Sequence, residues 1–131
     1  MKILVTGSSG RIGRAIYVRL VLEHEVVGLD RSPSSTADFV GDLTNVALLR
    51  QALRGVDAIV HTAALHAPHV GLVSDAEFER VNIQGTGLLA ELAVELGIEH
   101  FIFTSTTALY GKAITPGRTA IWVDETLVPP A

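Results

Sequence analysis

Three glycines close to the N-terminus of this 131-residue chain have the spacing of a phosphate-binding turn. Gly7 permits a tight turn, Gly10 lets the backbone approach a pyrophosphate closely, and Gly13 lets a new helix pack against a strand. The N–H groups at the start of that helix would face the phosphates. The segment therefore predicts a dinucleotide site, and its candidate cofactor-binding residues are Gly7, Ser9, Gly10, Arg11, Ile12 and Gly13.

The spacing of these glycines, GxxGxxG, differs from the GxGxxG of the commonest dinucleotide fingerprint. No Lys-Ser or Lys-Thr pair follows them, which argues against the phosphate loop of a nucleotide triphosphatase. A glycine turn without a ligand is the alternative. The neighbouring elements favour the dinucleotide, because the apolar run 2–5 predicts a buried strand and apolar residues every four positions from Ile12 predict an amphipathic helix.

An acidic residue follows the second predicted strand, which covers 25–29. This residue, Asp30, is placed to accept hydrogen bonds from an adenosine ribose. Its carboxylate would repel the additional phosphate of NADP and so favours NAD. The neighbouring Arg31 could stack on adenine or pair with a 2′-phosphate, so NADP stays open as the alternative cofactor.

The rest of the chain continues to alternate between strand and helix patterns, which predicts an α/β fold with a parallel sheet. Further strands are predicted over 39–40, 57–61 and 101–103. One helix is predicted from a cap at Thr44 to Arg54, and a longer one from the capping box of Ser74 and Glu77 to Gly97, with Phe78, Asn82, Gly85, Leu89, Leu92 and Leu96 on one face. Residues 112–131 are predicted to form a loop with a short strand over 120–123.

Polar and small residues follow every predicted strand. In an open parallel sheet, ligands bind at the carboxyl ends of the strands, where the winding of the sheet reverses. Thr62, Ala63 and Ala64 would let a flat ligand lie against the backbone. The chain is therefore predicted to be one doubly wound, Rossmann-type domain over 1–131 with a ligand crevice at this edge.

Composition narrows the possible partners. The net charge is −4, with the two signs mixed along the chain, so neither a nucleic acid nor a membrane surface is indicated. The chain has no cysteine and no apolar run long enough to span a membrane, and a cytoplasmic location is the default expectation. The mean hydropathy of +0.40 is high, which buried parallel strands explain in part. The rest suggests apolar surface that meets further sequence or a partner.

Together, these motifs resemble the extended short-chain dehydrogenase/reductases, the family of sugar-nucleotide epimerases and dehydratases. The resemblance rests on residues 6–13, Asp30, 42–43, 61–64, 81–86 and 104–111, in the family's order. It implies strand order 3-2-1-4-5, NAD as cofactor and a sugar or sugar nucleotide as substrate.

The resemblance also implies roles for single residues. Asp42 would contact the adenine amino group and Leu43 the ring, although an acid in a turn before a helix is the alternative for Asp42. Asn82 would keep the site ordered through hydrogen bonds to backbone or water, and the alternative is an ordinary amide in the core. Thr106 would form a hydrogen bond with the substrate oxygen that is oxidised, and the alternative is a solvated threonine. The remaining candidate cofactor-binding residues are Thr62, Ala63, Ala64, His66 and Thr104.

Three histidines, at positions 61, 66 and 69, are close in sequence but do not indicate a metal site. No cysteine supports them, and Pro68 lies inside the His-x-x-His spacing, which disfavours a helix. We therefore predict no metal and expect His66 to make a polar contact with cofactor or substrate.

The family's catalytic pair, a tyrosine followed four residues later by a lysine, does not occur in this sequence. Val21 stands four residues after Tyr17, and Ile114 four after Tyr110. By comparison with relatives, the tyrosine is expected about five residues past Ala131. The expectation is a truncated domain that lacks turnover, with its fifth strand an unpaired edge through which a homodimer could form.

We accordingly predict the dinucleotide-binding portion of an NAD-dependent epimerase, dehydratase or dehydrogenase. The alternative is a non-catalytic NAD(P)-binding sensor or regulatory module. A flavin or simple nucleotide binder is disfavoured by Asp30 and Asp42.

Overall fold

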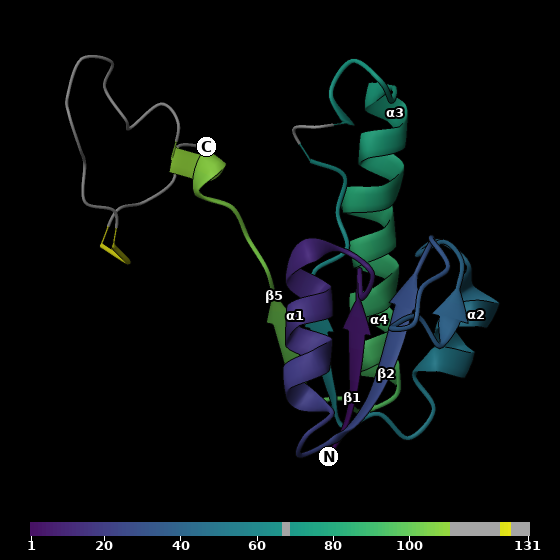
Figure 1. The fold of residues 1–131 in the computed structure, drawn as a ribbon. Coiled ribbons are helices and arrows are strands. Elements are labelled where there is room, and N and C mark those ends of the chain that lie inside the picture. The colour runs from purple at the N-terminus through teal and green to yellow at the C-terminus, as the bar shows by residue number, and fades with distance from the viewer. Residues whose placement is uncertain (67–68, 111–123, 127–131) are drawn as a thin grey trace.

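The computed structural model describes residues 1–66, 69–110 and 124–126. Its centre is a five-stranded parallel sheet in the order β3-β2-β1-β4-β5 (Figure 1). The strands are β1 (Lys2–Thr6), β2 (Glu25–Asp30), β3 (Phe39–Val40), β4 (Ala58–His61) and β5 (His100–Phe103). This order confirms the predicted Rossmann-type sheet.

Helices cover both faces of the sheet, because alternate residues of each strand point to opposite sides. Ile3 and Val5 of β1 pack with Ile16 and Leu20 of α1 (Arg11–Leu20), which is drawn beside β1 in Figure 1. On the other face, Leu4 belongs to a larger core cluster with residues of α2 (Val46–Ala52) and α4 (Thr86–Glu95). The sheet is therefore doubly wound, as predicted.

The helix after β3 begins one residue later than predicted. Its N-cap is Asn45, whose side chain accepts a hydrogen bond from the N–H of Leu48 at 3.1 Å. The prediction of Thr44 as the cap was wrong, because the Thr44 hydroxyl donates to Oδ1 of Asp42 at 2.7 Å and so belongs to the preceding turn.

The long helix predicted from Ser74 to Gly97 is present but is interrupted. Ser74 caps α3 (Asp75–Phe78) through its hydroxyl oxygen, which confirms the predicted start of the helix. The carboxylate of Glu77, the second member of the predicted capping box, is bound by Arg80 instead. A π-helical segment, η2 (Glu79–Gly85), then separates α3 from α4. The extra residue in each turn of η2 changes the helical register, and Leu96, which was predicted on the apolar face, is 46% exposed.

The chain after β5 leaves the sheet and leads to the short helix η3 (Thr107–Tyr110), which stands apart from the body of the domain (Figure 1). The strand predicted over 120–123 lies outside the described residues. Asp124 accepts a hydrogen bond from the N–H of Thr126 in a local turn. Within the described ranges, no helix combines the length and the apolar character needed to cross a membrane.

Candidate functional site

The glycine turn is built by contacts that leave no room for side chains. Gly7 has φ +70°, and a Cβ there would lie 2.8 Å from the backbone of Ala63. A Cβ on Gly13 would lie 2.1 Å from the carbonyl oxygen of Gly7. Both glycines therefore allow two backbone segments to approach closely. At Gly7 the turn after β1 contacts the segment after β4, and at Gly13 the start of α1 contacts the turn.

Backbone donors are available at the start of α1. Its N-cap is Gly10, which provides no side-chain cap, and the first helical hydrogen bond runs from the N–H of Arg14 to the carbonyl of Gly10. The N–H groups of residues 11–13 precede that bond and have no partner within the helix. Such a helix end attracts phosphate.

Asp30 connects the end of β2 to the glycine turn. Its Oδ2 accepts a hydrogen bond from the N–H of Ser9, and its Oδ1 accepts one from the N–H of Ser32, both at 2.9 Å. The hydroxyl of Ser9 donates to the carbonyl of Ser32. The carboxylate predicted to bind ribose is therefore fixed beside the glycine turn, and the neighbouring Arg31 is exposed.

The segment after β4 is held from two sides. The Thr62 hydroxyl donates to the carbonyl of Thr6 at 2.7 Å. Asn82 of η2 makes two hydrogen bonds with Leu65: its Oδ1 accepts from the Leu65 N–H and its Nδ2 donates to the Leu65 carbonyl, both at 2.8 Å. Between these anchors, Ala63 is half-buried and Ala64 is exposed, so small side chains border the turn.

His61, the last residue of β4, is fully buried and links three elements. Its Nδ1 shares a hydrogen bond with Oγ1 of Thr6 at 2.6 Å, and its Nε2 shares one with Oγ1 of Thr86 at 2.8 Å. Burial lowers the pKa of His61 to about 4, because a charged imidazole would lose its hydration. His61 is thus a neutral structural link beneath the site.

His66 and His69 lie together on the loop after β4, with ring centroids 5.0 Å apart. The N–H of His66 donates to Nδ1 of His69 at 3.1 Å. The residues that the structure describes contain no group of three or more histidine, cysteine or acidic side chains able to hold a metal ion.

Asp42 lies in an ionic cluster that the sequence did not predict. Arg80 of η2 donates to both carboxylate oxygens of Asp42, at 2.9 and 2.7 Å, and to both oxygens of Glu77. The hydrogen bonds from Arg80 are the main cause that lowers the pKa of Asp42 below its usual value. Asp42 is therefore an ionised acceptor, and Arg80 is a site residue that sequence reasoning missed.

The predicted residues after β5 are not gathered with the others. The N–H of Thr104 donates to the carbonyl of His61 and extends the sheet by one bond. Thr106 is exposed, and its hydroxyl accepts a hydrogen bond from the N–H of Ala108 within the same segment, which stands away from the sheet (Figure 1). The structure thus places Thr106 apart from the other candidate residues.

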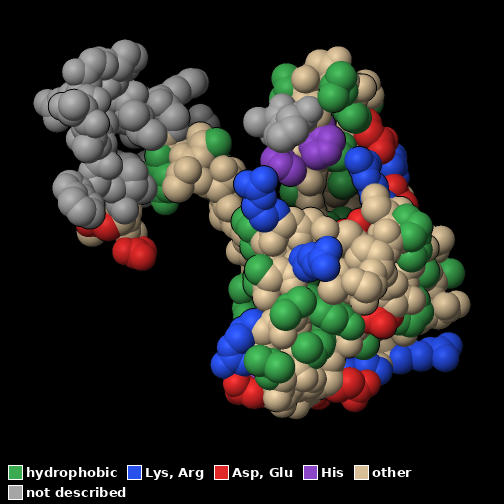
Figure 2. Space-filling model, in the orientation of Figure 1, with side chains coloured by type: hydrophobic (Ala, Val, Ile, Leu, Met, Phe, Trp, Pro, Cys, Tyr) green, Lys and Arg blue, Asp and Glu red, His purple; other side chains and the backbone are tan. Residues whose placement is uncertain are grey.

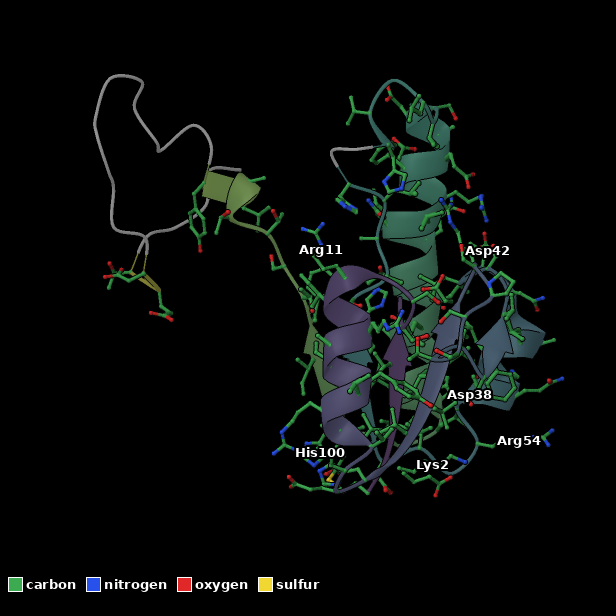
Figure 3. All side chains as sticks on the ribbon, in the orientation of Figure 1. Lys2, Arg11, Asp38, Asp42, Arg54 and His100 are labelled. Atoms are coloured by element: carbon green, nitrogen blue, oxygen red, sulfur yellow. The ribbon has the colours of Figure 1, made fainter. Side chains whose placement is uncertain are left out.

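The two ends of the sheet differ in character. Arg11 and Asp42 lie at the carboxyl end, whereas Lys2, Arg54 and His100 lie at the opposite end (Figure 3). On the face shown in Figure 2, basic side chains and histidines lie near each other toward the same carboxyl end. Donors for phosphate and acceptors for hydroxyl or amino groups are therefore gathered at one edge of the sheet.

A comparison with protein families identifies the group to which this arrangement belongs. The model of the NAD dependent epimerase/dehydratase family matches residues 3–127. The chain belongs to the NAD dependent epimerase/dehydratase family. This confirms the resemblance found in the sequence.

Individual relatives agree with the family. The chain is 31% identical to a 3-beta-hydroxysteroid dehydrogenase of Mycolicibacterium neoaurum, with 96% of the chain and 36% of that protein covered. It is 33% identical to a UDP-glucose 4-epimerase of Klebsiella pneumoniae, with 85% of the chain and 93% of that sequence covered.

The fold also matches solved structures of the family. A short-chain dehydrogenase/reductase superfamily protein of Agrobacterium tumefaciens with bound NAD superposes with a TM-score of 0.78 at 32% identity, over the whole chain and 40% of that protein. The chain thus spans less than half the length of this structure and of the steroid dehydrogenase.

Proposed function

We propose that the chain is the dinucleotide-binding portion of an NAD-dependent epimerase or dehydratase that acts on a sugar or sugar nucleotide. The observation that carries this proposal is the pairing of Asp30 with the N–H of Ser9. It holds a ribose acceptor beside the free N–H groups of α1 that would receive the pyrophosphate. Because the Gly7 turn contacts Ala63 without side chains between them, the residues present fit a flat, phosphate-bearing cofactor.

Each part of the cofactor has its proposed partners. The residues around Gly10 bind the pyrophosphate, Asp30 accepts hydrogen bonds from the adenosine ribose, and Asp42 with Leu43 meets the adenine. The ribose and the pyrophosphate lie against the small residues after β4. Asn82 holds this segment of the chain in place. The proposed contacts farther along the cofactor and the substrate are His66, Thr104 and, for the oxidised substrate oxygen, Thr106.

Bound NAD would supply the hydride acceptor for oxidation of a substrate carbon. The residues of this chain bind and orient that acceptor, and Asp30 selects the unphosphorylated ribose through its charge. The family's tyrosine–lysine pair is not among the 131 residues, because neither Tyr17 nor Tyr110 is followed by lysine at the fourth position.

The second candidate is a non-catalytic NAD(P)-binding module. It is favoured by the position of Thr106 on the segment that stands apart from the sheet and from the other candidate residues. The enzyme is favoured by the segment 104–111, because a regulatory module does not require a substrate-facing hydroxyl.

Titration calorimetry with NAD and NADP tests the proposal. We expect NAD to bind at least tenfold more tightly than NADP, a difference of about 1.4 kcal/mol. Asp30→Asn should weaken NAD binding and reduce the preference. Asp57→Asn is the matched control, because Asp57 also accepts a backbone N–H, that of Lys2, but at the opposite end of the sheet. Failure of the chain to bind either dinucleotide would refute the proposed function.

A further inference from the structure

The π-helical segment η2 changes which residues face the sheet. In an α-helix, residues five apart, such as Arg80 and Gly85, point about 140° away from each other. In a π-helix the hydrogen bond runs from residue i to i+5, so such residues lie on nearly the same side. Short π segments inside α-helices are rare and occur frequently at functional sites. The position of η2 therefore requires a local explanation.

Both Arg80 and Gly85 meet the same segment, which follows β3. Arg80 binds the carboxylate of Asp42 with two parallel hydrogen bonds. A Cβ on Gly85 would lie 2.9 Å from the Cβ of Leu43, so the helix backbone comes close to Leu43. The change of register in η2 thus lets the guanidinium of Arg80 bind Asp42 while the backbone of the same segment packs closely on Leu43.

All five N–H donors of Arg80 are used. Nη1 donates to Oδ1 of Asp42 and, at 2.7 Å, to the hydroxyl oxygen of Thr44. Nη2 donates to Oδ2 of Asp42 and to Oε1 of Glu77, and Nε donates to Oε2 of Glu77. A guanidinium held by five bonds has one orientation, and it fixes the plane of the carboxylate that it binds.

The two oxygens of Asp42 differ in their remaining capacity. Oδ1 accepts three hydrogen bonds, from the N–H and hydroxyl of Thr44 and from Arg80. Among the described residues, Oδ2 accepts one bond, from Nη2 of Arg80. Because the Asp42 side chain is 36% exposed, a donor from outside the protein can reach Oδ2.

We propose that Arg80 is a positioning residue for adenine recognition, which holds the Asp42 carboxylate so that Oδ2 receives the exocyclic amine of an adenine ring. The inference rests on the proposed function, in which NAD binds with its adenine beside Asp42. The site then discriminates against a purine that has a carbonyl oxygen at that position, because two oxygens would face each other without a proton. Arg80 does not touch the ligand in this proposal.

Both the planar shape and the positive charge of Arg80 are required to position the Asp42 carboxylate. Without Arg80, Asp42 and Glu77 are two neighbouring carboxylates that repel each other, and Asp42 is held only through Oδ1 by Thr44, so that Oδ2 loses its fixed direction. A lysine would keep the charge but cannot form the two parallel bonds. Both replacements should therefore loosen the recognition of the amine, and glutamine should do so more than lysine.

The test compares NAD with nicotinamide hypoxanthine dinucleotide, which has a carbonyl oxygen in place of the adenine amine. We expect the wild-type chain to bind NAD about tenfold more tightly than the hypoxanthine analogue, as for the loss of one hydrogen bond. Arg80→Gln and Asp42→Asn should reduce this ratio to about twofold or less, and Arg80→Lys to an intermediate value. Affinities are measured by calorimetry, with folding checked by thermal melting.

Arg50→Gln is the matched control. Arg50, in the last turn of α2, makes a two-bond pair with Glu95 of α4, with both distances 2.7 Å, whereas Asp42 precedes the first turn of α2. This variant loses a comparable ion pair and should keep the wild-type ratio. If Arg80→Gln does not fold, Arg80→Lys carries the test, since it preserves the charge.

The outcomes separate the inference from the proposed function. A folded Arg80 variant that keeps the wild-type ratio would overturn the inference, as would a wild-type chain that binds both dinucleotides equally well. In either case NAD binding, and with it the proposed function, would stand. A wild-type chain that binds neither dinucleotide would refute the proposed function and the inference that rests on it.

Discussion

The imidazole of His61 and the hydroxyl of Thr6 share a buried hydrogen bond of 2.6 Å between the last residues of two neighbouring strands. The other ring nitrogen bonds Thr86, the first residue of α4. One side chain thus connects β1, β4 and the helix that begins where η2 ends. Because the glycine turn follows Thr6 directly, this link supports the site from below.

The pKa of His61 predicts how stability depends on pH. Burial lowers it from 6.5 to about 4 in the folded chain, so the unfolded chain binds the proton more readily. The free energy of unfolding should therefore be constant with respect to this group above pH 6.5 and should fall between pH 6.5 and 4. The total loss is on the order of 3 kcal/mol.

Urea unfolding at a series of pH values measures this dependence, and NMR titration of the His61 ring measures its pKa directly. His61→Gln, which carries no charge at any pH, should remove the loss between pH 6.5 and 4. A ring that titrates near 6.5 in the folded chain would contradict the prediction.

A pair of glycine-to-alanine variants tests the close contacts of the turn. In Gly13→Ala the new Cβ would lie 2.1 Å from the carbonyl oxygen of Gly7, so α1 must move away from the turn. We expect a loss of more than about 3 kcal/mol in the free energy of unfolding and loss of NAD binding. Thermal melting and calorimetry measure the two effects.

Gly87→Ala is the control for this variant. Gly87 lies in α4, and no described atom lies within 4 Å of the position of its Cβ. Alanine is the better helix former, so this variant should gain about 0.5 to 1 kcal/mol and bind NAD normally. A Gly13→Ala chain that bound NAD as well as Gly87→Ala would show that the close contact is not needed.

Features that depend on local pattern were predictable from the sequence. The glycine turn and Asp30 at the end of β2 follow from short motifs, the parallel sheet follows from the alternation of strands and helices, and the strand order follows from the family resemblance. The helix start at Ser74 was equally visible, because a serine followed three residues later by a glutamate is typical of an N-terminus.

Features that depend on distant contacts were not predictable. Arg80 is a helix residue 38 positions from Asp42, and nothing in its neighbourhood distinguishes it from a solvated arginine. The contacts of η2 are equally distant in sequence, with Asp42 after β3 and Leu65 after β4, and the local apolar spacing predicted one continuous helix. The cap at Asn45 was missed because Thr44 is an equally good N-cap residue by type.

The edge of the sheet at β5 predicts self-association. Within the described residues no strand pairs with the outer side of β5, and Ile102 and Phe103 are 58% and 57% exposed. An apolar, unpaired edge offers hydrogen bonds to a second copy. Light scattering should therefore show association that increases with concentration, and Ile102→Lys should weaken it.

Leu72→Lys is the control for this edge, because Leu72 is 82% exposed on the loop before α3. It removes an exposed apolar side chain without touching β5. A chain that stays monomeric at high concentration would contradict the prediction, and so would equal effects of the two lysine variants.

The two tyrosines predict that the 131-residue chain binds NAD without turnover. A tyrosine that shuttles a proton near neutral pH needs a lowered pKa. The pKa of Tyr17 is instead raised, first by burial and then by the negative charge of Asp38, to which its hydroxyl donates at 3.4 Å. Tyr110 lies on η3, on the segment that stands apart from the sheet, with no lysine four residues later.

We therefore expect no formation of NADH absorbance and no epimerisation when the chain is mixed with NAD and UDP-glucose or other sugar nucleotides, at concentrations where calorimetry shows the dinucleotide bound. An active epimerase of the family serves as the positive control. Turnover that persisted in a Tyr17→Phe, Tyr110→Phe double variant would show that another group of this chain moves the proton. Turnover abolished by Tyr110→Phe alone would place η3 in the active site and contradict the expectation directly.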